Sequence, residues 1–163
     1  MALLRSTVLG SIVLLLVMAN TPAFAELRTA TLRGFEEVPA ISTKATGLFA
    51  MFIADDANSL AWSLIYTDLE GGTVTAAHIH IGQPAVAAGI VIHFCGTGGK
   101  PPCPAPPATL TNTATSADVV ALPAQGIAAG EIAEVVRAIR EGKAYVNVHT
   151  TTYPTGEIRG QIQ

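Results

Sequence analysis

Two histidines lie two residues apart in the run Ala76-Ala77-His78-Ile79-His80. Side chains alternate between the two faces of a β-strand, so residues two apart point the same way and both imidazoles can converge on one ion. Copper and zinc take several nitrogen donors at about 2 Å, of which this pair supplies roughly half. The run therefore predicts part of a transition-metal site. The alternative is a pair of polar side chains on a solvated strand face.

Two further histidines extend this hypothesis. His149 ends a second alternating run, residues 145–150, and becomes the third ligand if that strand lies beside the first. His93 lies in the run 90–94 and is a candidate for an additional metal ligand. The sequence thus predicts a site formed by His78, His80 and His149, and it leaves open which strands are neighbours.

The first acidic motif favours a structural role. Glu36 and Glu37 precede Val38 and Pro39, and proline restricts the residue before it to extended backbone. We interpret this segment as the exit of a strand with solvated carboxylates. The alternative is that one of the two glutamates orients a ligand histidine from behind.

Catalytic motifs are missing from the sequence. Glu157 and Arg159 share one face of the last predicted strand and are expected to form a surface ion pair or to face partners on the next strand. No Gly-x-Ser-x-Gly, His-Glu-x-x-His or glycine-rich phosphate loop occurs, so hydrolase and nucleotide chemistry have no support. A small redox enzyme would need an open coordination position on the bound metal. No residue is assigned a catalytic role, and a non-enzymatic function is preferred.

The elements that position these residues are mostly strands. Residues 46–54 and 60–67 alternate apolar and polar side chains around a short polar turn, which predicts a β-hairpin with Trp62 in the core. Residues 129–141 carry the one good helical pattern, which Gly142 ends. Further strands are predicted at 73–81, 89–94, 144–150 and 157–162, with a weaker one within 108–122. One short helix among six or seven strands predicts an all-β fold, an antiparallel Greek-key-like β-sandwich or barrel.

The first 25 residues have the features of a secretory signal peptide. Arg5 precedes an apolar run, and Ala23 and Ala25 occupy the small-residue positions before a cleavage site. The run is shorter than the roughly 18–20 residues of a membrane span, so no transmembrane anchor is expected after cleavage. An uncleaved amino-terminal anchor is the alternative. The expected mature chain, residues 26–163, is one secreted or periplasmic domain.

The charge and the cysteines of this expected mature chain limit its partners and its compartment. Loss of Arg5 leaves eight Lys and Arg against twelve Asp and Glu, a formal charge of −4, so nucleic acid is not an expected partner. Cys95 and Cys103 flank a Gly- and Pro-rich stretch. In an oxidising compartment they are expected to form a disulfide, with two free thiols as the alternative.

Three separated stretches resemble the CHRD domain, the module named after chordin and also found alone in exported bacterial proteins. They are residues 32–39 (LRGFEEVP), residues 77–82 (AHIHIG), and residues 145–150 (YVNVHT) with 154–162 (PTGEIRGQI). Because the resemblance extends over essentially all of 26–163 and the stretches occur in the right order, the mature chain is identified as a CHRD-like domain.

The resemblance implies no enzymatic activity. Its HIH and NVHT motifs are similar in style to the histidine strands of copper–zinc superoxide dismutases, which are Greek-key sandwiches, and this analogy implies ligand roles for His78, His80 and His149. The analogy weakens after His80, where no His-rich zinc loop follows, and His93 stands where relatives are expected to have an aliphatic residue. The expected function is binding of a transition metal, copper favoured and zinc second, in metal handling or redox protection. The alternative is a metal-free adhesion or interaction module for an extracellular or envelope protein.

Overall fold

The computed structural model describes residues 26–163, and the predicted signal peptide, residues 1–25, lies outside the described residues. This part of the chain consists of eight strands, three short 3-10 helices and one α-helix. The strands are β1 (Glu26–Arg33), β2 (Thr46–Ile53), β3 (Ser59–Thr67), β4 (Val74–Ile81), β5 (Gly89–Cys95), β6 (Ala108–Thr115), β7 (Ala144–Thr150) and β8 (Ile158–Gln161), and the α-helix is α1 (Ile132–Arg140).

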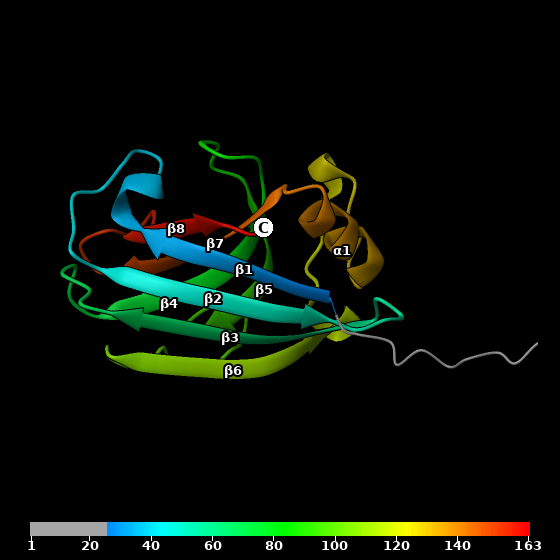
Figure 1. The fold of residues 1–163 in the computed structure, drawn as a ribbon, viewed down its shortest axis with the longest axis horizontal. Helices are drawn as coiled ribbons and strands as arrows, with labels where there is room; N and C mark the ends of the chain where they lie inside the picture. Colours follow the sequence, from blue (N-terminus) through cyan, green and yellow to red (C-terminus); the bar gives the residue numbers. More distant parts are fainter. Residues whose placement is uncertain (1–25) are drawn as a thin grey trace, which may run out of the picture.

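The eight strands form one sheet in the order β5-β4-β7-β8-β1-β2-β3-β6, and every neighbouring pair is antiparallel. The sheet bends so strongly that its two halves face each other (Figure 1). Trp62 of β3 and Phe94 of β5 lie near opposite ends of the strand order, yet their ring centroids are 4.0 Å apart. The amide of Val120, shortly after β6, donates to the carbonyl of Val91 in β5 at 3.0 Å. The sheet is therefore a nearly closed barrel, which confirms the predicted antiparallel all-β fold.

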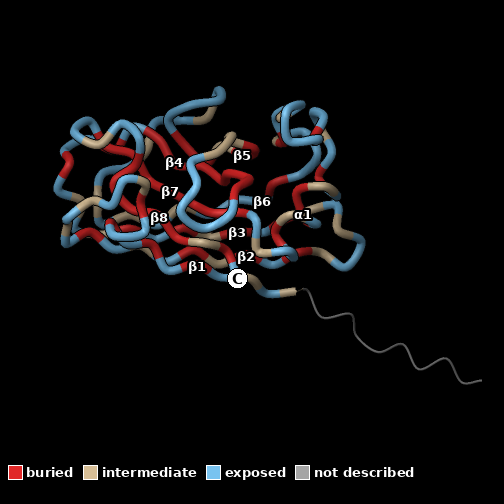
Figure 2. The backbone as a smooth tube through the Cα atoms, turned by 90° about the horizontal axis from the view of Figure 1, so that it is seen from above, coloured by how far each residue is buried: buried red, intermediate tan, exposed pale blue. Residues whose placement is uncertain are grey.

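The hydrophobic core lies inside this barrel, because alternate side chains of each strand point inward. The predicted hairpin is formed by β2 and β3, which pair over their whole length. Figure 2 shows the buried backbone concentrated in the strands and the exposed backbone in the loops. Trp62 is buried as predicted, together with the other residues on its face of β3: Leu60, Leu64 and Tyr66.

Helix α1 covers one end of the barrel (Figure 1). It begins three residues later than predicted, because Gly130 has a φ of 84°, outside the helical range, and the preceding turn is closed by the 2.7 Å hydrogen bond from the amide of Ala128 to the Glu131 carboxylate. Gly142, with φ of 65°, follows the last turn as expected. In the described part of the chain, no helix is both long and apolar enough to cross a membrane. The buried face of α1 consists of Ile132, Val135, Val136 and Ile139.

The predicted disulfide is present between Cys95, at the end of β5, and Cys103. It closes the loop 96–102, which is tightened by a 2.7 Å hydrogen bond from the amide of Gly96 to the carbonyl of Pro101. A Cβ at Gly98 would lie 2.4 Å from the ring of His93, so glycine allows the loop to lie directly on β5. The disulfide thus holds the loop that carries Thr97 against the histidine-bearing strands.

Candidate metal centre

Strand β4 lies between β5 and β7, and this arrangement brings the histidines together. In the β4–β7 register, Ala76 pairs with His149 and His78 pairs with Asn147, so His149 is a diagonal neighbour of His78. On the other side of β4, His78 pairs with His93 of β5. The strands that carry His78, His80 and His149, β4 and β7, are therefore neighbours, which the sequence alone had left open.

His78 and His80 lie on the face of β4 that points away from the core. Ala77, which precedes His78, and Ile79, which lies between the two histidines, belong to the core. An outward face is usually solvated, but both imidazoles are buried, at 3% and 6% exposure. Loops supply the cover, since residues 88, 97 and 154 each place an oxygen atom on one of the histidine rings. The site therefore lies between the sheet and the loops that cover it.

One ligand atom from each of His78, His80 and His149 lies within 4.8 Å of the other two. The closest pair is Nδ1 of His78 and Nε2 of His149, 3.2 Å apart. All three side chains are buried. The three histidines named from their spacing in the sequence are thus brought together in one cluster.

The second nitrogen of each ring faces an oxygen outside the cluster. Nδ1 of His80 lies 2.9 Å from the carbonyl of Ala88, and Nδ1 of His149 lies 3.1 Å from the carbonyl of Pro154. A carbonyl only accepts, so both Nδ1 atoms carry the proton and both Nε2 atoms present a lone pair to the cluster. Metal-ligating histidines are oriented in the same way, by donating the other ring N–H to a backbone carbonyl or a carboxylate.

His78 is oriented by a hydroxyl. Its Nε2 lies 2.6 Å from Oγ1 of Thr97, and the same Oγ1 lies 2.9 Å from Nδ1 of His93. Thr97 can therefore accept from His78 and donate to His93, which leaves Nδ1 of His78 free to bind an ion. His93 stands beside His78, with ring centroids 4.9 Å apart, but does not belong to the three-residue group.

Burial keeps the clustered imidazoles neutral. Burial, together with the neighbouring His149, His80 and His93, lowers the pKa of His78 to about 3. Burial also lowers the pKa of His80 to about 4, and it lowers the pKa of His149. A metal ligand must be unprotonated to donate, so these imidazoles are ready to bind at neutral pH.

The structure separates the two glutamates of the first acidic motif. Glu36 ends the 3-10 helix η1 (Gly34–Glu36) and is exposed, whereas Glu37 is buried at 7% exposure. Burial raises the pKa of Glu37 to about 7, while a backbone hydrogen bond from Val38, the charge of Arg159 and the Asn147 amide act in the opposite direction. The interpretation of both as solvated carboxylates is wrong for Glu37, because the sheet and loops enclose it next to the cluster.

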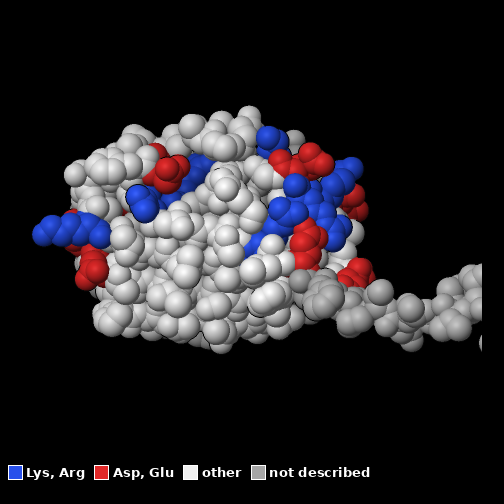
Figure 3. Space-filling model, viewed as in Figure 1, with Lys and Arg blue, Asp and Glu red and all other residues white. Residues whose placement is uncertain are grey.

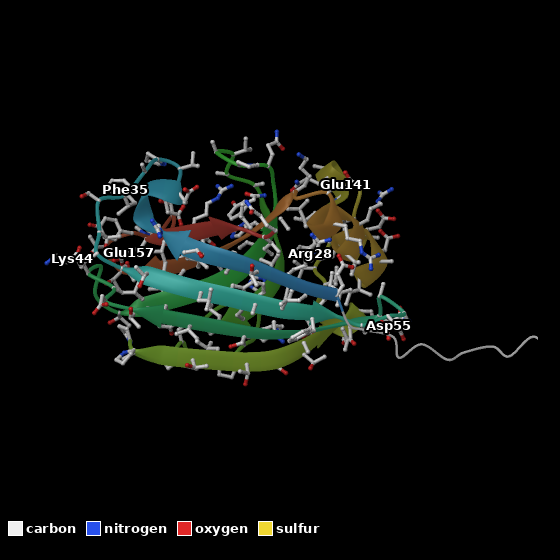
Figure 4. All side chains as sticks on the ribbon, viewed as in Figure 1. Arg28, Phe35, Lys44, Asp55, Glu141 and Glu157 are labelled. Carbon is white, nitrogen blue, oxygen red and sulfur yellow. A yellow bond between two sulfur atoms is a disulfide. The ribbon has the colours of Figure 1, made fainter. Side chains whose placement is uncertain are left out.

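Glu157 and Arg159 are also buried, at 0% and 2% exposure, so the expected surface position is wrong. Figure 4 shows Glu157 at the same end of the barrel as Lys44, which lies in the loop before β2. Its carboxylate accepts from the amides of Glu70 and Gly71 and, in addition, from two threonine hydroxyls. The outward face of β8 is covered by loops. The alternation of residues in the sequence shows which face a residue occupies, but it does not show whether loops bury that face.

Arg159 contributes to the site through Tyr145. Its guanidinium lies 3.4 Å from the centroid of the Tyr145 ring and donates to the carbonyls of Gln83 and Val86. Tyr145 in turn stacks on His80, with centroids 4.6 Å apart. Strand β8 thereby supports the imidazole of β4 through the tyrosine of β7.

Sequence reasoning missed Asn147. It is 2% exposed, and its Oδ1 lies 2.9 Å from Nε2 of His80 and 3.0 Å from Nε2 of His149. The signal was available, because Asn147 precedes His149 by two residues and therefore shares its strand face, as His78 shares that of His80.

Fold and site together define a class of protein: a small disulfide-linked antiparallel barrel with a three-histidine cluster between its sheet and its loops. The chain belongs to the CHRD domain family, which matches residues 28–162. No match was found to a curated protein or to a solved structure.

Proposed function

We propose that this CHRD domain protein binds a transition-metal ion, copper in preference to zinc, through His78, His80 and His149, and that it serves in metal handling or redox protection. The observation that carries the proposal is the arrangement of the three imidazoles. Their ligand atoms lie within 4.8 Å of one another. Each ring is also oriented by an oxygen on its other nitrogen.

Chemistry supports a transition metal over calcium or magnesium. Imidazole nitrogen suits copper and zinc, whereas calcium and magnesium take oxygen ligands. Copper(II) binds more tightly than zinc at most nitrogen sites, which is the reason for naming copper first. Because the pKa values of His78 and His80 are low, neither imidazole has to lose a proton before it binds an ion near neutral pH.

We further propose that the protein works outside the cytoplasm, secreted or in the periplasm. The disulfide between Cys95 and Cys103 is of a kind that persists in oxidising compartments. The signal-like features of residues 1–25 support the same location.

Titration of the metal-free mature protein with Cu(II) and Zn(II) tests the metal proposal. We expect one ion per chain and a loss of at least about tenfold in affinity for each of His78→Ala, His80→Ala and His149→Ala. His93→Ala is the matched control, because it removes an imidazole that contacts Thr97 and lies outside the cluster. Affinity of the unmutated protein no tighter than millimolar, or three variants that bind like it, would contradict the proposal.

A second function, that of an interaction module, is favoured by one surface. Over β2, β3 and β6, Figure 3 shows a broad face without charged side chains. Four large apolar side chains on β1, β2 and β3 are exposed by 39% to 54%: Leu27, Leu48, Phe52 and Ile65. Large exposed apolar patches commonly mark sites of protein association.

Variants of this face distinguish the two functions. An envelope protein that cross-links to the unmutated chain and to His78→Ala, but not to Leu48→Lys or Phe52→Lys, would support the interaction module. Cross-linking that is unchanged in the two lysine variants would exclude this face.

A further inference from the structure

We propose that the side-chain oxygen of Asn147 is the fourth donor of the metal centre, so that four protein atoms enclose the ion. The inference rests on the proposed function, because it adds a ligand to the same site. It also decides what kind of site this is, because a centre with four protein donors leaves no position for a substrate.

Asn147 stands on the correct face and in the correct register. It pairs with His78 across the β4–β7 ladder and lies two residues before His149 on β7. Its side chain is buried at 2% exposure. The Oδ1 atom contacts the cluster directly, 2.9 Å from Nε2 of His80 and 3.0 Å from Nε2 of His149.

These contacts lack a proton. The carbonyls of Ala88 and Pro154 hold the proton of His80 and of His149 on Nδ1, so both Nε2 atoms are acceptors. The amide oxygen of Asn147 is an acceptor as well. The lone pairs of Oδ1 and of each Nε2 face one another at about 3 Å and repel, and a cation between them converts the repulsion into binding.

Rotation of the amide would move the conflict to the other side of the Asn147 side chain. On its other side, Nδ2 of Asn147 faces the carbonyl of Thr155 at 3.5 Å. A rotated amide would point its oxygen at the Thr155 carbonyl, which can only accept. The carbonyl of Thr155 therefore favours the orientation in which Oδ1 faces the histidines.

Three of the six separations among the four donor atoms are close to those of a four-coordinate site. At the corners of a tetrahedron with bonds of about 2 Å, donor atoms lie about 3.3 Å apart. The three measured separations among His78 Nδ1, His149 Nε2, Asn147 Oδ1 and His80 Nε2 are 3.2 Å, 3.0 Å and 2.9 Å. The three imidazole nitrogens lie within 4.8 Å of one another, so small movements of these side chains accommodate an ion.

A closed site holds its metal and does not activate a substrate. Structural metal sites have four protein ligands, whereas catalytic sites keep one position for water or substrate. The amide oxygen also bears on the choice of ion, because Cu(I) selects soft ligands, and an oxygen donor contributes more to Cu(II) or Zn(II). Asn147 therefore makes the centre a binding site for a divalent ion.

Two substitutions of similar shape test the role of the oxygen. We expect Asn147→Leu to lower Zn(II) affinity by at least about tenfold, and Asn147→Asp, which keeps an oxygen donor toward the ion but loses the contact of Nδ2 with Thr155, to lower it less. Cu(I) affinity should stay within about threefold in Asn147→Leu, because imidazoles suffice for that ion. Thermal unfolding of the metal-free variants shows whether each one folds.

The visible spectrum of bound Co(II) gives a readout that a structural role would not change. We expect the strong absorption of a four-coordinate ion in the unmutated protein and in Asn147→Asp, and a changed spectrum in Asn147→Leu. Equal Zn(II) affinity and equal Co(II) spectra in the unmutated protein and Asn147→Leu would overturn the fourth donor while leaving the three histidines in place. Failure of the unmutated protein to bind any of these ions would overturn the proposed function itself.

Discussion

The rings of His80 and Tyr145 stack face to face, with centroids 4.6 Å apart and planes inclined by 1°. One residue of the covering loop ties the pair together. The amide of Ala88 donates to the Tyr145 hydroxyl at 3.1 Å, and its carbonyl lies 2.9 Å from Nδ1 of His80. The imidazole is therefore held by a neighbouring ring and by a loop that the same ring fixes.

This relationship predicts that Tyr145 positions a ligand without binding the ion. Tyr145→Leu should lower Zn(II) affinity by about 10- to 100-fold, because His80 loses both the stack and the loop that accepts its proton. Tyr145→Phe keeps the stack and should lower affinity less. Calorimetric titration of both variants measures the difference, and a Tyr145→Leu protein that is folded and binds normally would show that the stack is irrelevant.

Acid should destabilise the metal-free protein through the buried histidines. Burial lowers the pKa of His78 to about 3 and of His80 to about 4 from the unfolded value of 6.5. Between the lowered pKa values and 6.5, the unfolded chain binds more protons at these two histidines than the folded chain does. Their contribution to stability is therefore full above pH 6.5 and decreases as the pH falls toward 3. Urea unfolding at a series of pH values measures this dependence.

Glu37 acts in the opposite direction, because its pKa is raised from 4.5 to about 7 and its folded form gains a proton first. The stabilisation that Glu37 gains from protonation is complete near pH 4.5, so the net loss of unfolding free energy should be steepest below that pH. Glu37→Gln should make the loss steeper between pH 7 and 4.5. A stability profile that is flat from pH 6.5 to 3 would show that the histidines are not neutral in the folded protein.

Substitution of Glu157 should lower the free energy of unfolding more than substitution of an exposed carboxylate. It is fully buried and accepts hydrogen bonds from two amides and two hydroxyls, as a charged acceptor. Glu157→Gln replaces one oxygen by a donor that meets other donors, so we expect a loss of about 2–4 kcal/mol in unfolding free energy. The exposed Glu36→Gln is the control and should change it by less than about 0.5 kcal/mol. If Glu157→Gln and the unmutated protein unfold at similar denaturant concentrations, the stabilising role of this hydrogen-bond network is refuted.

The disulfide should support both stability and the metal centre. Replacing Cys95 and Cys103 together by serine should cost about 2–3 kcal/mol. It should also weaken metal binding, because the loop that carries Thr97 loses its closure near His78. Thr97→Val isolates the second effect, as it removes the hydroxyl and leaves the disulfide. Alkylation of the native protein without reduction should label neither cysteine, and labelling of both would contradict the bond.

Processing should produce a mature chain that begins at Glu26. Ala23 and Ala25 precede the expected cut. Glu26 is the first residue of β1, and its carboxylate pairs with Arg28 and with Arg140 of α1. Intact mass of the exported protein measures the start, and a mass that retains residues 1–25 would favour an uncleaved membrane anchor.

Local patterns in the sequence determined the elements of this fold. A period of two identifies strands such as β3 and shows that His78 and His80 share a face, because alternation is a property of the strand itself. The spacing of three and four residues in α1 and the turn between β2 and β3 are local in the same sense. The cysteines are eight residues apart, so their bond was predictable too.

Tertiary structure alone decided which strands are neighbours and which outward faces are covered. His78 and His149 are 71 residues apart, and they meet only because β4 pairs with β7. Glu37, Glu157 and Arg159 have sequence patterns of surface residues, yet they are buried because loops close over the outer face of the sheet. Periodicity reports the side of a strand on which a residue lies. The long-range packing of loops determines whether that side meets water, and the burial, the lowered pKa values and the contact of Asn147 with the histidines all follow from that packing.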